Sequence, residues 1–140
     1  MKWVTWEIVG VDRMACAWLI RKLIDPKAKF LFIPPSQKNL PAGAEPFDIP
    51  GVRLSHHQGH CSFHTVLGEY NLSDPVLHRI ARIIDEADTV QEVCVEPAAP
   101  GLDLICEGLR LTSPDDDTAL ERGTMVYEAL SAKLLKEMTS

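Results

Sequence analysis

The sequence predicts an α/β domain with a small, mostly parallel sheet and a helical majority. Two observations carry this prediction: the first third of the chain has the pattern strand, helix, strand, and the rest is mainly helical in pattern. A chain of 140 residues supplies one hydrophobic core of ordinary size, so we expect residues 1–140 to form a single domain. With 46% hydrophobic and 24% charged residues, the composition excludes a disordered chain.

The chain opens with a strand, a helix and a second strand. Residues 3–9 are rich in aromatic and β-branched side chains and are followed by Gly10, which is typical of a strand and its end. Asp12 is then placed to cap a helix over residues 13–24, which an Asp-Pro pair terminates. Residues 30–33 favour a short buried strand. Because strand–helix–strand units join parallel strands, we expect these two strands to pair in parallel.

The middle of the chain is predicted to be a long loop followed by a third strand. Residues 34–51 contain five prolines and two glycines, which is typical of a loop. Its length favours a lid or an ordered wrap over a domain boundary. Residues 52–55 favour a strand that leads directly into a group of histidines.

The remaining elements are mostly helices. The pattern predicts helices over residues 61–70, 75–88 and 102–111, a short strand over 93–95, and a final helix that begins behind residues 113–116. Asp74 before Pro75 is typical of a helix cap with proline at the first helical position, and residues 113–116 have the form of a capping box. The final helix carries an apolar stripe, so we expect it to pack on the core and to be a candidate homodimer face. The stripe consists of Leu120, Tyr127, Leu130 and Leu134.

Charge and cysteine usage exclude several classes of protein. The net charge of −6 argues against a nucleic-acid partner, because proteins that bind duplexes usually present a basic face. The longest apolar run, residues 14–20, is far shorter than the roughly 20 residues that span a bilayer, so we expect no membrane partner. Charged residues interrupt the N-terminus where a signal peptide would be apolar. Four widely spaced cysteines argue against disulfides and a structural zinc site, which predicts a reduced, cytoplasmic protein.

A cluster of histidines is the main candidate for chemistry. Four of the five histidines lie within residues 56–64. His60 and His64 are four residues apart, so a helix that begins near residue 61 would present both imidazoles to one metal ion. His56 and His57 end a predicted strand and point to opposite faces, so we expect one of them to join the site. The alternative is that these histidines only make hydrogen bonds in a polar loop.

Two carboxylates at the end of the helix over 75–88 are candidate metal ligands. Asp85 and Asp88 are three residues apart, and Asp88 continues the apolar stripe of that helix. The helix dipole disfavours carboxylates in the last turn, which makes a purely structural role less favourable there. A solvated acidic helix end is the alternative.

A third candidate lies just after the first strand. Asp12 and Arg13 begin a helix at the position where open α/β sheets bind ligands. Asp12 is either a metal ligand or only the cap of this helix, and Arg13 is either an oxyanion ligand or a surface arginine. Cys61 is the one thiol beside the histidines and is therefore the candidate reactive thiol.

At these residues the chain resembles the chromate-resistance family with its ChrB-like domain. The resemblance covers nearly the whole chain and is carried by VDRMACAWLIR at 11–21, GAEPFD at 43–48, SHHQGHC at 55–61 and IDEAD at 84–88. It implies a role in resistance to chromate, an oxyanion of Cr(VI), without implying a mechanism. A weaker similarity links Asp12, the His56–His57 pair and Asp88 to the metal ligands of DHH-type phosphoesterases, although two further motifs of those enzymes are missing.

These observations support a cytoplasmic metal-binding domain of the chromate-resistance type. In the enzyme hypothesis, His57, His60, His64 and a carboxylate hold a divalent metal, and Arg13 orients an oxyanion or phosphoester. Imidazole and carboxylate ligands suit Zn, Mn or Fe. The alternative is a non-catalytic metal or oxyanion sensor, or an accessory module, that acts through a dimer interface. A third possibility is a structural protein whose histidines only form hydrogen bonds.

Overall fold

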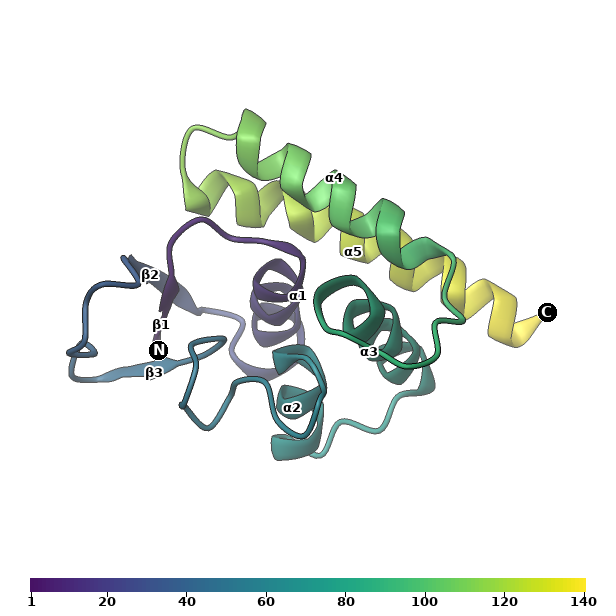
Figure 1. Cartoon of the computed structure of the whole chain (residues 1–140), viewed down its shortest axis with the longest axis horizontal. Helices are drawn as coiled ribbons and strands as arrows, with labels where there is room; N and C mark the ends of the chain where they lie inside the picture. Colours follow the sequence, from purple (N-terminus) through teal and green to yellow (C-terminus); the bar gives the residue numbers. More distant parts are fainter.

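The computed structural model describes residues 1–140 and contains one three-stranded, all-parallel sheet. The strands are β1 (Lys2–Trp6), β2 (Lys29–Ile33) and β3 (Ala44–Pro46), in the spatial order β2-β1-β3. In the central pairing Lys2 lies beside Lys29 and Trp6 beside Ile33. The sheet lies at one end of the molecule and the helices occupy the rest (Figure 1). The α/β class with a small parallel sheet and a helical majority is therefore confirmed.

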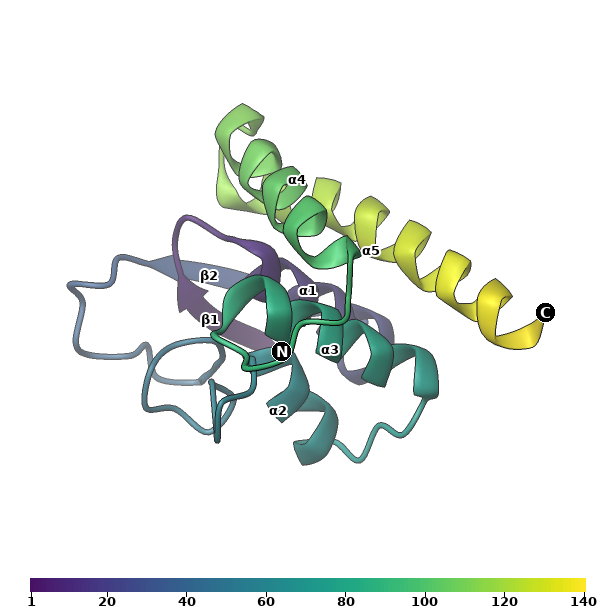
Figure 2. The ribbon, with the colours of Figure 1, turned by 45° about the vertical axis from the view of Figure 1, so that its right-hand side comes forward.

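The fold has five α-helices, and four of them pack around the first. They are α1 (Val11–Leu19), α2 (Ser62–Glu69), α3 (Pro75–Asp88), α4 (Ala98–Thr112) and α5 (Asp116–Thr139). Helix α1 contacts each of the other four, and all of its residues except Arg13 are buried. It continues as a π-helical turn over Ile20–Ile24, in which Asp25 N donates to Ile20 O at 2.7 Å. Helix α1 is thus the central helix of the fold (Figure 2).

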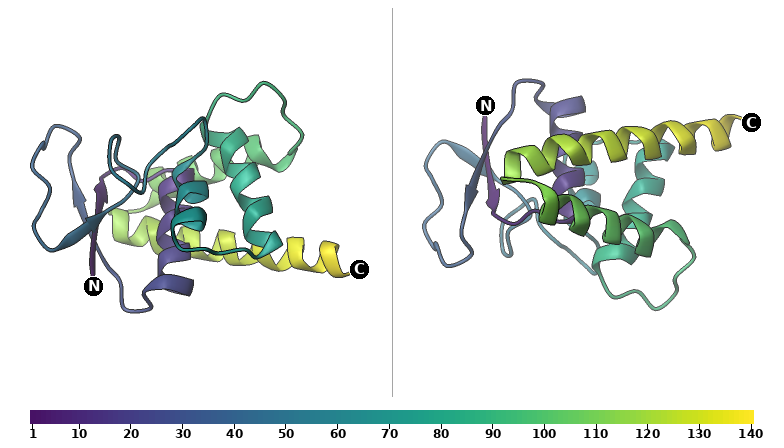
Figure 3. Two further views of the ribbon diagram at one scale, coloured as in Figure 1. Left: turned by 90° about the horizontal axis from the view of Figure 1, so that it is seen from below. Right: turned by 90° about the horizontal axis from the view of Figure 1, so that it is seen from above.

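Helices α4 and α5 form an antiparallel pair along one side of α1 and α3 (Figure 3). Leu120, Tyr127 and Leu134 of α5 are buried and Leu130 packs on the core, as the predicted stripe requires. The last turns of α5 are exposed and project past the other helices (Figure 3). No helix has both the length and the apolar character that a membrane crossing needs.

Several predicted elements agree with the structure. The strand over 30–33 and its parallel pairing are confirmed, as is the helix over 75–88. Asp74 caps that helix by accepting a hydrogen bond from Val76 N at 2.9 Å. Local capping rules were sufficient here because the cap and its acceptor are neighbours in sequence.

Other boundaries were wrong for identifiable reasons. The first strand ends at Trp6 rather than at residue 9, because Ile8 has a positive φ of 64° that an extended strand excludes. The third strand is β3, inside the predicted loop, whereas in residues 52–55 only Leu54 forms an isolated bridge, to Phe47. Residues 93–95 are exposed and have no strand to pair with.

The cap of α5 was also predicted incorrectly. Helix α5 begins at Asp116, and Asp115 caps it through a hydrogen bond from Thr118 N at 2.8 Å. Ser113 instead donates its hydroxyl to Leu109 O at the end of α4. Ser113 therefore belongs to the end of α4 and Asp115 to the start of α5, so the predicted capping box does not form.

Candidate functional site

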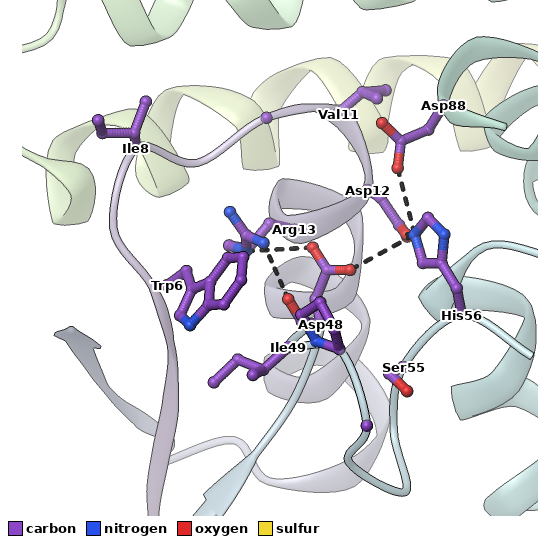
Figure 4. A pocket seen from close by; sticks show the side chains of 13 residues that line it. Trp6, Ile8, Val11, Asp12, Arg13, Asp48, Ile49, Ser55, His56 and Asp88 are labelled. Atoms are coloured by element: carbon purple, nitrogen blue, oxygen red, sulfur yellow. Dashed lines mark hydrogen bonds and ion pairs between the residues drawn. The ribbon is translucent and has the colours of Figure 1, made fainter. Parts of the chain in front are cut away.

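A cavity of about 460 Å³ lies beyond the carboxyl end of β1 (Figure 4). Its polar lining includes Asp12 and Arg13 from α1, Asp48 and His56 from the loops that follow β3, and Asp88 from the end of α3. Open α/β sheets bind ligands at this edge, outside the carboxyl ends of their strands. We therefore take this cavity as the candidate site.

Asp12 is buried and caps a helix other than its own. Its side chain is 2% exposed, and its oxygens accept hydrogen bonds from Ser62 N at 2.8 Å and Phe63 N at 2.9 Å, at the start of α2. The predicted cap of α1 is therefore incorrect, because Gly10 holds that position and has no side chain to contribute. A carboxylate at the N-terminus of α2 is favoured by the free backbone N–H groups and by the helix dipole.

Asp48 is held by Arg13 and Ser62. The Ser62 hydroxyl donates to Asp48 Oδ1 at 2.6 Å, and Arg13 Nε forms an ion pair with Asp48 Oδ2 at 3.1 Å. Arg13 Nη2 also donates to the backbone carbonyl of Asp48 at 2.8 Å. Asp48 is the site residue that the sequence reasoning missed. The only sequence signal was its place at the end of the GAEPFD segment.

His56 lies among three carboxylates. Its Nε2 is 3.0 Å from Asp12 Oδ2, 3.4 Å from Asp88 Oδ2 and 3.7 Å from Asp48 Oδ1 (Figure 4). The hydrogen bond to Asp12 raises the pKa of His56 to about 9, against the opposing effect of burial. The imidazole therefore carries a proton at neutral pH and occupies the place that a cation among carboxylates would take.

Burial and mutual repulsion disfavour the ionised forms of two of these carboxylates. Burial, followed by the charge of Asp12, raises the pKa of Asp48 to about 7, although Arg13 opposes the shift. The same two causes, in the same order, raise the pKa of Asp88 to about 6. The three carboxylates thus carry more negative charge than His56 and Arg13 neutralise. A bound cation would reduce the repulsion among these carboxylates.

The geometry of this cluster is compatible with a metal ion. One ligand atom each from Asp12, Asp48 and His56 lies within 4.8 Å of the other two. This is the only group of three or more histidine, cysteine or acidic side chains in the chain that meets this condition. Two carboxylates and an imidazole are ligands for borderline and hard divalent metals.

The other predicted ligands form a separate cluster. Asp85 Oδ2 lies 2.7 Å from His60 Nδ1, and Asp85 Oδ1 accepts from Cys61 N at 2.8 Å. The rings of His60 and His64 stack with centroids 3.9 Å apart. However, α2 begins at Ser62, so His60 precedes the helix and the two histidines do not share a helical face.

His57 lies outside both clusters. Its Nε2 donates to the backbone carbonyl of Arg53 at 2.9 Å. The structure therefore does not bring His57, His60 and His64 to one point. His56 is the predicted histidine that lines the cavity. Asp88 is the member of the predicted acidic pair that lies beside His56.

The environment of Cys61 is unfavourable to a reactive thiol. Cys61 is fully buried, and burial raises the pKa of its thiol far above the usual range. A reactive thiol needs the opposite, because the thiolate is the nucleophile. All four cysteines are unpaired, and Cys94 alone is exposed.

The fold and the site define a small α/β domain with a carboxylate–histidine cavity at the ends of its parallel strands. The family described as "ChrB, C-terminal domain" matches residues 3–134, so the chain belongs to that family, as its resemblance to the chromate-resistance proteins indicated. Protein ChrB of Cupriavidus metallidurans is 34% identical over 130 residues, which is 92% of this chain and 39% of that protein. The chain thus spans about two fifths of the length of this relative. No solved structure matches the chain.

Proposed function

We propose that this domain binds a divalent cation through Asp12, Asp48 and His56, and that the cation and Arg13 together bind a small oxyanion in the cavity. The observation that carries the proposal is the convergence of these three ligands on one point of the cavity wall. Asp88 is close enough to His56, at 3.4 Å, to serve as a fourth ligand.

The charges in the cavity support binding in this order. Three carboxylates face two cationic side chains, so the site has an excess of negative charge before a cation enters. A metal ligand must be the neutral imidazole, so a divalent cation would displace the proton of His56. Together with Arg13, the cation would then cancel the charge of the three carboxylates and remove the repulsion that an anion would otherwise meet in the cavity. Arg13 Nη2 donates to the Asp48 carbonyl, whereas Arg13 Nε is buried without a hydrogen-bond partner and makes only an ion pair with Asp48. A guanidinium has five N–H donors in all, so further donors remain for an oxyanion.

Membership of the chromate-resistance family supports chromate as one such oxyanion. The net charge of −6 gives a dianion no long-range attraction, so local positive groups must hold it. A bound cation would act as a Lewis acid or lower the pKa of a bound water, and zinc could not reduce chromate because it has no accessible redox change. A domain that holds zinc could therefore bind chromate without reducing it.

A non-catalytic sensor or accessory module is the second candidate function. The observation that favours it is a set of exposed apolar side chains on the outer helix pair, where Leu104, Leu111 and Met125 are 69%, 77% and 74% exposed. Such side chains favour an interface with a second copy or another protein. A metal-dependent change of molar mass in solution without turnover would select this candidate.

We also propose a reducing, cytoplasmic location. Four unpaired cysteines support it, because an oxidising compartment would expose Cys94 to disulfide formation.

Metal content of protein purified without a histidine tag tests the cation site. We expect one equivalent of Mn²⁺ or Zn²⁺ in the unmodified protein and its loss in His56→Ala. His64→Ala is the matched control, because it removes an imidazole from the separate cluster. Retention of metal in His56→Ala and its loss in His64→Ala would refute the proposed site and assign the metal to the His60–His64 cluster.

A further inference from the structure

The cavity has an apolar side that a bare oxyanion would leave unused. Trp6, Ile8 and Ile49 line the side away from His56 and Asp88 (Figure 4). The volume of about 460 Å³ is within the range of small-molecule pockets. A tetrahedral oxyanion takes up roughly the space of two or three waters, each about 30 Å³. Most of the cavity is thus available to a larger, partly apolar ligand.

Trp6 provides a rigid aromatic surface on this side. It is the last residue of β1 and packs against a small buried cluster of Val4, Ile33 and Ile49. Trp3 and Trp18 are 1% and 2% exposed, whereas Trp6 is only half-buried and lines the cavity. An indole fixed by packing on one side and open on the other suits a flat apolar ligand.

Ile8 is held in an unfavourable conformation beside Trp6. Its φ of 64° is unusual for a β-branched residue, and its side chain is 58% exposed at the cavity. The Asp116 carboxylate holds this backbone by accepting from Ile8 N at 3.1 Å and Val9 N at 3.0 Å. A strained residue that exposes an apolar side chain at a cavity indicates a contact with a ligand.

From this two-sided cavity we infer that the ligand is an organic anion, a flat aromatic or heteroaromatic ring that carries a phosphate or carboxylate group. The ring lies against Trp6, Ile8 and Ile49, and the anionic group faces Arg13 and the carboxylate–histidine cluster. The position of the anionic group depends on the function proposed above, whereas the ring site does not.

Paired probes test this inference by calorimetry, with Mn²⁺ and separately with EDTA. Phenyl phosphate is compared with inorganic phosphate, and benzoate with acetate, so that each pair differs in the ring. Burial of one ring face predicts about tenfold to fiftyfold tighter binding of the aromatic member. The pair with the larger preference identifies the anionic group.

Three variants locate the ring. We expect Ile8→Asn and Trp6→Leu to reduce the preference to about threefold or less, while Ile105→Asn, which changes an equally exposed isoleucine on α4, leaves it unchanged. Asparagine tolerates a positive φ, so Ile8→Asn should also raise the midpoint of urea unfolding. A merely structural role of Ile8 predicts that stability changes and the preference does not.

The outcomes separate this inference from the proposed function. Equal affinity for both members of each pair, no binding of any probe, or a preference that survives both cavity variants would overturn the ring site. A preference that appears equally in EDTA and Mn²⁺, in a protein that binds no cation, would keep the ring site and refute the cation site.

Discussion

Replacing Asp12 with asparagine should destabilise the protein strongly, even without any metal. The carboxylate is 2% exposed and accepts hydrogen bonds from the backbone N–H groups of Ser62 and Phe63 and from His56. An asparagine side chain of the same shape keeps only one oxygen. At least one of the two backbone N–H groups would then face an NH₂ group, which is a donor and cannot accept.

The magnitude follows from these contacts. A buried N–H without an acceptor costs about 1–3 kcal/mol, and a hydrogen bond to a charged group contributes about 1.5–3 kcal/mol. We therefore expect Asp12→Asn to lower the free energy of unfolding by about 3 kcal/mol, a large share of the 5–15 kcal/mol typical of a domain. Urea unfolding at pH 7 in EDTA, followed by circular dichroism, measures this change without a contribution from metal.

Asp88→Asn is the matched control, because it makes the same chemical change in the same cavity without removing an acceptor from a backbone N–H. The pKa of Asp88 is raised to about 6, so its ionised form at pH 7 is disfavoured in the folded protein, and asparagine removes that penalty. Its side chain is 36% exposed, and solvent screening limits the gain to no more than about 1 kcal/mol. A loss below 1 kcal/mol in Asp12→Asn, or an equal loss in both variants, would refute the capping role.

Three further predictions concern pH, packing and thiols. The pKa of His56 is raised from 6.5 to about 9, so the protonated imidazole stabilises the fold fully below pH 6.5 and this contribution disappears as the pH rises through 9. His56→Gln should therefore flatten the pH dependence of the free energy of unfolding in urea between pH 6.5 and 9. An unchanged slope in this variant would contradict the prediction. Gly123→Ala places a methyl group 3.0 Å from Met14 Sδ and should lower the free energy of unfolding by about 1–2 kcal/mol in the same assay. Gly108→Ala in α4 meets no atom within 4 Å and should raise the free energy of unfolding by about 0.5–1 kcal/mol. Thiol titration should detect about four thiols in denatured, unreduced protein but only Cys94 in the native state, and a denatured count near zero would show disulfides.

The sequence was most informative where structure depends on neighbouring residues. Asp74 and Pro75 fixed the start of α3, and the spacing of Leu120, Tyr127 and Leu134 identified the buried face of α5. Both signals are local, since a cap acts within a few residues and a helical stripe repeats every turn. The class of fold followed from the strand–helix–strand pattern of the first third of the chain and the helical pattern of the rest, which are local in the same sense.

The site could be predicted only in part because its contacts join distant parts of the chain. Asp12 caps a helix that begins 50 residues later, and Arg13 positions a carboxylate 35 residues away. Spacing rules for helices and strands contain no information about such pairs. His56 and Asp88 were both predicted as candidates, but Asp48, which also lies beside His56, is in a loop that Arg13 and Ser62 hold.

Side chains of α5 hydrogen-bond to the backbone near the beginning of the chain, so the two partners are synthesised at very different times. Asp116 fixes the backbone at Ile8 and Val9, and the Tyr127 hydroxyl donates to Val11 O at 2.7 Å, directly before Asp12. The residues that shape the rim of the cavity therefore leave the ribosome more than a hundred positions before the residues that hold them. A nascent chain that lacks α5 has none of these contacts, so the backbone at the rim of the cavity is held as described only after residue 127 has been synthesised.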